Sequence, residues 1–341
     1  MTPHVIVAHN LGMTDTPAPL VFAPAASATF AQRVAVALNV ELAGSEEREF
    51  EGGEHKMRPT VDVRGRDVYV IHQLHGDDTR SANDKLCRLL FFIGALKDAG
   101  AGRVTACLPY LPYARKDRRT QPRDPVTTRY VAGMFEAVGA DRVVVLEVHN
   151  ESAFDNAFRI ETVRLETAKV FAQHLAVNGA RSLVVASPDA GGMKRAQQFR
   201  SMLESGGERN VGMALMEKAR SGGVVSGEIL VGDVAGAEVI IYDDLIASGT
   251  TVLRTVSAAR KAGAIKVHVA AAHAVFTSAA RALFAPTGPD TVLISDSIPL
   301  SEDFRSLQGR RLTVCSVAPL FAEAVRRLHA GLPLDDVSRT G

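Results

Sequence analysis

The chain has 341 residues, of which 46% are hydrophobic, 6% are aromatic and none is tryptophan. Its 39 Lys and Arg residues nearly balance 38 Asp and Glu residues, for a net charge of +1. This balance excludes a general electrostatic attraction to nucleic acid or to a membrane surface. The length predicts two domains, and the low aromatic content predicts cores of Ala, Val, Leu and Ile, typical of parallel sheets covered by helices.

The cysteines and the first residues indicate the compartment. Cys87, Cys107 and Cys315 are odd in number, far apart and set in apolar contexts, which is typical of small buried residues rather than of disulfides or a zinc site. The sequence has neither a basic leader followed by an apolar core nor a run approaching about 18 apolar residues. We therefore expect a cytoplasmic protein that does not enter a membrane.

The first functional candidate in chain order is a glycine turn between residues 48 and 59, after a predicted helix at 29–38. The Gly52 and Gly53 pair is flanked by Phe50 and Glu54, so an aromatic ring and a carboxylate lie together on a bend. The same pattern is found at the tip of an ordinary hairpin with a half-exposed Phe, and both interpretations stay open.

A cationic loop follows the predicted strands 67–72 and 103–108, which are separated by a predicted helix at 85–98. Most runs of this kind are solvated faces. This one directly follows a strand, where open α/β sheets place ligand contacts, and it contains Asp117, which can organise guanidinium groups. A triphosphate needs such a density of positive charge. The five cations are Arg115, Lys116, Arg118, Arg119 and Arg123.

Two further strand ends carry polar residues. The predicted strand 142–148 contains Glu147 and is followed by His149, although a histidine in that place is more often structural. A second unit begins near Thr162, and its strand 182–186 leads to Asp189 and a pair of glycines at 191–192. The glycines let the backbone approach a ligand at a helix start. Asp189 is equally typical of a residue that caps the helix.

The segment 217–228 follows a short predicted strand at 213–216 and is rich in glycine and serine, so we predict a mobile loop. It carries Lys218 and Arg220. Two cations on a mobile loop can close over bound phosphates and stabilise charge. An ordinary exposed hairpin is the alternative.

The stretch from Ala237 to Thr251 has the strongest local pattern. An apolar strand ends in Asp243 and Asp244, which cannot remain unpaired inside an apolar layer and should lie at the carboxyl end of the sheet. A small hydroxyl-bearing loop and a helix follow, and backbone N–H groups at such a helix start form a concavity suited to phosphate. The loop residues are Ser248, Gly249, Thr250 and Thr251.

The strand, the two aspartates and the Ser/Thr/Gly loop resemble the phosphoribosyl pyrophosphate signature of phosphoribosyltransferases and ribose-phosphate pyrophosphokinases. The order Pro-Tyr, Tyr-Ala-Arg, Asp-Arg-Arg, Pro-x-Thr in residues 109–128 resembles the ATP loop of the pyrophosphokinases, and the resemblance covers most of the chain. It implies an α/β fold of two phosphoribosyltransferase-like domains, each a mainly parallel sheet flanked by helices. Because the last helix of relatives packs back on the first domain, the implied domains are 1–160 plus 315–341, and 161–314.

The resemblance also implies roles. The protein would transfer pyrophosphate from Mg-ATP to the 1-hydroxyl of ribose 5-phosphate, giving phosphoribosyl pyrophosphate and AMP, and would be a homo-oligomer built from dimers, with a hexamer as one arrangement. ATP would contact Phe50, Glu54, Arg115, Lys116, Asp117 and His149, the first two across a subunit interface. Ribose phosphate would contact Asp243, Asp244 and residues 248–251. His149 and Asp189 would serve the Mg²⁺ site, and Lys218 and Arg220 the transition state.

Some positions depart from the family pattern. Gly52 replaces an aspartate, Lys116 a glutamine, Ala219 an arginine, and Ala247 and Thr250 replace a carboxylate and a glycine of the sugar-phosphate loop. These departures leave three hypotheses: an ordinary pyrophosphokinase, a paralogue acting on a different ribosyl phosphate, and a catalytically silent regulatory subunit. Retained Arg115, His149, Lys218 and Arg220 argue against the third, and the arginine-rich loop argues against a phosphoribosyltransferase proper.

Overall fold

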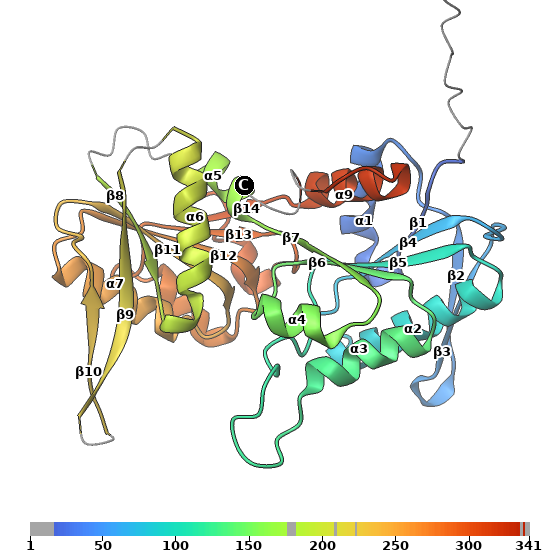
Figure 1. Cartoon of the computed structure of the whole chain (residues 1–341), viewed down its shortest axis with the longest axis horizontal. Helices are drawn as coiled ribbons and strands as arrows, with labels where there is room; N and C mark the ends of the chain where they lie inside the picture. Colours follow the sequence, from blue (N-terminus) through green and yellow to red (C-terminus); the bar gives the residue numbers. More distant parts are fainter. Residues whose placement is uncertain (1–16, 176–181, 208–209, 222–223, 335–336, 338–341) are drawn as a thin grey trace, which may run out of the picture.

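The computed structural model describes residues 17–175, 182–207, 210–221, 224–334 and 337, with only the backbone for 218–221 and 224–228. Two sheets with their helices form two lobes that lie side by side (Figure 1). The first sheet has five parallel strands in the order β1 (Leu20–Phe22), β4 (Asp67–Ile71), β5 (Arg103–Leu108), β6 (Arg142–Leu146) and β7 (Glu161–Leu165).

Helices cover both faces of the first sheet, because its strands are apolar on both sides. In β4, Val68 and Val70 face one core, whereas Tyr69 and Ile71 face the other, as expected from the alternation of side chains along a strand. Helices α2 (Ala82–Asp98) and α3 (Thr127–Ala137) cover the first face, beside α4 (Glu151–Ala157). Helices α1 (Ala28–Leu38) and α9 (Ala318–Ala330) cover the second face.

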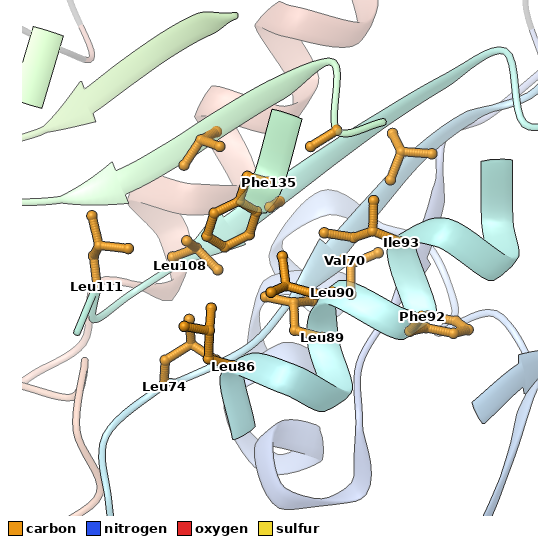
Figure 2. Packing of buried hydrophobic residues seen from close by; sticks show 14 of the residues in the cluster. Val70, Leu74, Leu86, Leu89, Leu90, Phe92, Ile93, Leu108, Leu111 and Phe135 are labelled. Atoms are coloured by element: carbon orange, nitrogen blue, oxygen red, sulfur yellow. The ribbon is translucent and has the colours of Figure 1, made fainter. Parts of the chain in front are cut away.

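The core beneath α2 illustrates why this helix forms. Figure 2 shows apolar side chains at helical spacing on α2 pointing toward the sheet and toward Phe135 of α3. Each of these buried side chains stabilises the fold by about 1.5–3 kcal/mol relative to an exposed one. The helix begins at Ser81, whose hydroxyl accepts a hydrogen bond from the Asp84 N–H. The residues of α2 in this cluster are Leu86, Leu89, Leu90, Phe92, Ile93 and Leu96.

The second sheet has seven strands. Their order is β10 (Val224–Val231), β9 (Val211–Ser221), β8 (Leu183–Ser187), β11 (Glu238–Ile246), β12 (Lys266–Ala274), β13 (Thr291–Ser295) and β14 (Leu312–Cys315). All neighbours are parallel except β9 and β10. Helix α7 (Thr250–Lys261) packs on one face of β11, and α5 (Ala168–His174) and α6 (Met193–Ser205) pack on the other. A short α8 (Glu302–Arg305) adds Phe304 to the α7 side.

The α/β fold class is confirmed, and the connection between lobes differs in detail from expectation. Strand β7 pairs with β6, so the chain passes to the second lobe only after Leu165, whereas the predicted boundary lies between residues 160 and 161. At the far end, α9 returns to pack against α1, with Phe30 and Phe321 in edge-to-face contact. The division into two domains with a discontinuous first domain stays a prediction.

Two antiparallel hairpins extend from the lobes. The first pairs β2 (Ser45–Glu49) with β3 (His55–Pro59) and packs on α2. The second is the β9–β10 pair, which replaces the loop predicted for residues 217–228: the strand that was expected to end at Met216 continues to Ser221. Cross-strand pairing along the described part of this segment therefore favours the hairpin alternative over the loop.

Two expectations about composition can be compared with the fold. Cys107 and Cys315 are buried as expected, but Cys87 is exposed, because it lies on a side of α2 that faces away from the sheet. None of the three forms a disulfide. No helix in the described ranges combines the length and the hydropathy that a membrane span requires.

Candidate functional site

A cleft of about 520 Å³ is lined by loops that follow strands of both sheets. Because all the contributing strands are parallel within their sheets, their carboxyl ends deliver these loops to one edge of each sheet. The first sheet contributes the loops after β5 and β6, and the second contributes the segments after β8 and β11. The lining includes Arg115, Asp117, Arg118, His149, Asp189, Arg195, Asp243, Asp244 and residues 245–252.

Asp243 and Asp244 lie within β11 near its carboxyl end, and their carboxylates form an acidic pair in the wall of the cleft. Asp244 is the more deeply placed, with 9% of its side chain exposed, and accepts a hydrogen bond from His149 Nδ1 at 3.0 Å. Burial opposes its ionisation, but the bond from His149 and the charge of Arg195 outweigh burial and lower the pKa of Asp244. Burial, and then the neighbouring charge of Asp244, raise the pKa of Asp243 well above its ordinary value. The acidic pair therefore offers one firmly ionised carboxylate, Asp244, and one carboxyl group, Asp243, whose raised pKa favours the protonated form.

His149 follows β6 of the first sheet and hydrogen-bonds the acidic pair on the second sheet. The hydrogen bond to Asp244 raises the pKa of His149 above 6.5, because the adjacent carboxylate stabilises the imidazolium. Its Nδ1 is occupied by Asp244, and the residue lines the cleft. The structure thus brings the predicted ATP-site histidine against the predicted ribose-site aspartate.

Arg195 is the functional candidate that sequence reasoning missed. It lies in the first turn of α6, with 14% of its side chain exposed, and its Nη2 donates to the Val148 carbonyl at 3.0 Å. Its Nη1 lies 3.7 Å from Asp243 and 3.5 Å from Asp244. One guanidinium therefore contacts both carboxylates of the acidic pair and the backbone of Val148, the residue before His149. The only sequence signal was its place three residues after the glycine pair.

Glu147 supports this arrangement from behind the cleft. Its Oε1 accepts hydrogen bonds from the Thr167 N–H at 2.8 Å and from the Tyr242 hydroxyl at 3.2 Å. Its Oε2 lies 3.7 Å from Arg195 Nε. The backbone of Glu147 has a φ of 43°, a conformation that costs energy for a residue with a Cβ. These contacts hold the strained turn that aims His149 into the cleft.

The predicted hydroxyl loop forms the opposite end of the cleft. Ser248, Gly249, Thr250 and Thr251 all line it, and α7 begins at Thr250. Gly249 has a φ of +75°, and a Cβ there would lie 2.9 Å from Leu283, so this position requires glycine. The hydroxyls of Ser248 and Thr250 lie 3.0 Å apart and hydrogen-bond each other. Backbone N–H groups at the start of a 12-residue helix suit a phosphate, and here the Thr250 N–H donates to the Ser248 hydroxyl at 3.4 Å.

The cationic loop that follows β5, called the arginine loop below, lies only partly in the cleft. Arg115, Asp117 and Arg118 line it, but Lys116, predicted to bind ATP, pairs with Asp124 at 2.8 Å and is not among the lining residues. Asp124 also accepts from the Thr120 N–H and hydroxyl. Lys116 thus braces the loop from within.

Asp189 caps a turn, as one of its two interpretations expected, and it also borders the cleft. Its Oδ1 accepts a hydrogen bond from the Gly192 N–H at 3.0 Å, which caps the short 3₁₀ turn η3 (Ala190–Gly192). The residue also lines the cleft. The described residues contain no group of three or more His, Cys, Asp or Glu side chains able to enclose a metal. A cation here would have to complete its shell with water or phosphate oxygens.

Two further predicted residues, Phe50 and Glu54, do not line the cleft within a single chain. Phe50 and Glu54 flank η2 (Glu51–Gly53) at the tip of the β2–β3 hairpin, on the side of the first lobe away from the second (Figure 1). The guanidinium of Arg48 covers the Phe50 ring at 5.0 Å. Lys218 and Arg220 lie on β9, opposite Glu228 and Val225 of β10, and their side chains are outside the described part of the structure.

Comparison with known proteins matches both halves of the chain. Residues 20–139 match the N-terminal domain of ribose phosphate pyrophosphokinase, and residues 225–339 match a phosphoribosyl synthetase-associated domain. The chain is 32% identical to a ribose-phosphate pyrophosphokinase of Helicobacter hepaticus over 90% of this chain and 95% of the relative. It is 33% identical to that of Deinococcus radiodurans, over 92% and 95%. The solved phosphoribosylpyrophosphate synthetase of Mycobacterium smegmatis superposes with a TM-score of 0.79 at 30% identity, covering 92% of this chain and 99% of that one.

Proposed function

The chain belongs to the ribose-phosphate pyrophosphokinase family, and from this premise we propose how its cleft carries out the reaction. The enzyme transfers the β,γ-pyrophosphoryl group of ATP to the 1-hydroxyl of ribose 5-phosphate. The oxygen of the 1-hydroxyl forms a bond to the β-phosphorus and releases its proton. The bond between the β-phosphorus and the oxygen that bridges the α and β phosphates breaks, and that oxygen leaves with AMP. The products are phosphoribosyl pyrophosphate and AMP. The activity named for the relatives favours neither a different sugar nor a silent regulatory subunit.

One observation carries this assignment: the same cleft is lined by the cationic loop, the acidic pair of β11 and the hydroxyl loop. Arg115 and Arg118 would neutralise the phosphate chain of ATP, with His149 beside them. Asp243 and Asp244 would accept hydrogen bonds from the ribose hydroxyls. Residues 248–251 would hold the 5-phosphate through backbone N–H groups and hydroxyls. Pyrophosphoryl transfer depends mainly on such positioning and charge neutralisation.

The donor set fits Mg²⁺ better than a softer metal, because the cleft offers carboxylate oxygens rather than thiolates. Asp189 and His149 are the residues we assign to its site, with water and phosphate oxygens completing the shell. Bound Mg²⁺ would neutralise charge on the triphosphate. The chain's own residues would orient it: Asp244 holds the imidazole of His149, and the Gly192 N–H holds Asp189.

Phe50 and Glu54 support an oligomer. They lie at a hairpin tip of their own lobe, away from the cleft, so their proposed contact with ATP requires a neighbouring subunit. A homo-oligomer built from dimers, with a hexamer as one arrangement, satisfies this requirement. Lys116, which pairs with Asp124, is assigned an indirect role in ATP binding through the shape of its loop.

The reaction is tested by measuring AMP release from ATP. We expect AMP only when ribose 5-phosphate and Mg²⁺ are both present, and loss of AMP when a chelator removes the metal. Parallel reactions with other ribosyl phosphates test whether Ala247 and Thr250 alter the choice of sugar. Equal or greater rates with another ribosyl phosphate would contradict the assignment of ribose 5-phosphate, and no AMP with any sugar would contradict the activity.

Replacing Lys218 with alanine tests the proposed transition-state role. We expect kcat to fall on the order of a hundredfold, because one donor that stabilises developing charge is worth about that factor, with little change in ATP affinity. Steady-state kinetics and ATP titration measure the two quantities. Lys261→Ala, at the end of α7 away from the cleft, is the control. Equal losses of affinity and turnover would speak against the role.

A further inference from the structure

The imidazole of His273 links the two sheets behind the cleft. It lies near the end of β12 in the second sheet and is 5% exposed. Its Nε2 lies 3.1 Å from the carbonyl oxygen of Leu146, the last residue of β6 in the first sheet. Its Nδ1 lies 2.9 Å from the Ser297 hydroxyl. Neither the sequence patterns nor the proposed chemistry assigns this residue a role.

The partners of His273 determine its tautomer. A carbonyl oxygen only accepts, so Nε2 carries the proton and donates to Leu146. Burial lowers the pKa of His273, which keeps the ring neutral, so Nδ1 accepts from the Ser297 hydroxyl. The Ser297 hydroxyl also lies 3.1 Å from the Ala272 carbonyl. That carbonyl already accepts from the Ser295 hydroxyl at the shorter distance of 2.6 Å, which leaves the Ser297 proton for Nδ1 at 2.9 Å. The ring is therefore fully hydrogen-bonded and held in one orientation.

The second lobe's anchor for His273 is itself fixed by the first lobe. Gln73, two residues after β4, donates from Nε2 to the carbonyl oxygens of Asp296 and Ser297, both at 2.9 Å. Its backbone N–H donates to the Ser27 hydroxyl at 2.9 Å. Ser297 is therefore held twice: its hydroxyl contacts His273 of the second lobe, and its carbonyl oxygen accepts from Gln73 of the first lobe.

Three contacts of His273 lead to segments that border the cleft. Leu146 precedes His149 by three residues. In the ladder between β11 and β12, His273 is opposite Leu245, next to Asp244. The ring also meets Tyr110 edge to face at 5.2 Å, at the start of the arginine loop. One buried side chain therefore touches the supports of the ATP side and of the ribose side, although it does not line the cleft itself.

We propose that His273 is a positioning residue for pyrophosphoryl transfer: its Nε2–H bond to the Leu146 carbonyl sets the spacing between the two substrate sites. The inference rests on the proposed function and adds to it what registers one site against the other. In-line transfer needs the attacking hydroxyl about 3–3.5 Å from phosphorus, and a 1 Å displacement can cost about a hundredfold. Each site by itself would be unaffected by a change in their separation.

Two substitutions separate the two hydrogen bonds of the ring. His273→Asn places a carbonyl near the position of Nδ1 and keeps the Ser297 bond but loses the bond to Leu146. His273→Gln places an N–H donor near the position of Nε2 and restores it. We expect kcat to fall about thirtyfold in His273→Asn and to return to within about threefold in His273→Gln. Affinities for ribose 5-phosphate alone and for a non-hydrolysable ATP analogue alone, measured by calorimetry, should change less than about threefold in both.

His268 supplies a matched control on the same strand. It is 9% exposed and bonds Thr291 at 2.7 Å and Glu238 at 3.2 Å, all within the second sheet. His268→Asn should lower thermal stability and leave kcat within about twofold. The inference is overturned if His273→Asn keeps wild-type kcat, if His268→Asn loses as much, or if a binary affinity falls with kcat. Absence of AMP formation by the wild-type enzyme would instead overturn the proposed function.

Discussion

Asp244→Asn should lower kcat/KM for ribose 5-phosphate by about a thousandfold, which corresponds to roughly 4 kcal/mol. The substitution keeps the size of the side chain but removes the charge that pairs with both His149 and Arg195. Truncating one partner of such a buried charge network typically costs about 3–5 kcal/mol, because the remaining charges are left uncompensated. Steady-state kinetics with ribose 5-phosphate varied at saturating ATP measures the effect.

The same variant makes a spectroscopic prediction. Because the Asp244 carboxylate raises the pKa of His149, the neutral amide should let that pKa fall, as followed by NMR titration of the imidazole. Asp290→Asn is the control: Asp290, like Asp244, pairs with an arginine, and it accepts a hydrogen bond from the Val267 N–H, but it lies away from the cleft. It should change activity by less than about twofold. A kcat/KM of Asp244→Asn within tenfold of wild type would refute the assignment of Asp244 to the ribose site.

Arg195→Met should abolish measurable turnover, a loss of more than about a thousandfold, and should lower the free energy of unfolding by about 3–5 kcal/mol. Methionine fills the space of the side chain but leaves Glu147, Asp243 and Asp244 without the cation that lies between them. It also removes the donor to the Val148 carbonyl. Urea unfolding and AMP release measure the two losses.

The pH dependence of the stability loss identifies its electrostatic cause. In the wild type the folded-state pKa of Asp244 is lowered, so this group contributes stability above its unfolded pKa, near 4, that is lost as the pH falls. Without Arg195 that contribution shrinks. The stability difference between Arg195→Met and wild type should therefore be nearly constant from pH 7 down to about pH 5 and shrink as the pH falls below about 4.

Controls on the same helix separate charge from packing. Arg200 of α6 pairs with Glu204 at 3.0 Å on the exposed side, and Arg200→Met should cost less than about 1 kcal/mol, as exposed pairs do. Arg195→Lys keeps the charge without the forked donors and should recover part of the stability but little activity. A pH-independent stability loss in Arg195→Met would attribute it to packing instead.

Local sequence was sufficient for the strand ends that carry chemistry. The stretch 237–251 predicted a buried strand, two carboxylates, a hydroxyl loop and a helix. The structure has β11, which carries Asp243 and Asp244 and continues beyond them to Ile246, followed by the hydroxyl loop and α7. The apolar runs of both sheets also predicted the α/β fold, since a strand buried on both faces has a periodicity that needs no long-range information. The assigned roles of these residues stay predictions until the variants are measured.

The differences between the expected and the observed structure share one cause, which is that pairing partners are not visible in a local pattern. Residues 217–228 have a loop-like composition, but β10 provides a partner for β9. Lys116 belongs to a cationic loop typical of ligand contacts, but in the folded loop it pairs with Asp124. Its proposed role in ATP binding stays a prediction. Strand β7 was placed in the second unit, but β6 offers it an edge.

The sequence by itself determined which residues stand at the carboxyl ends of strands, because periodicity and turn chemistry act over a few residues. Only the tertiary structure decided which of those ends meet. Arg195 lies nearly 50 residues from Asp244 along the chain, and His273 lies 127 residues from Leu146. Their charges and hydrogen bonds acquire a function only because two separately formed sheets bury them against each other, where water no longer competes for the same donors and acceptors.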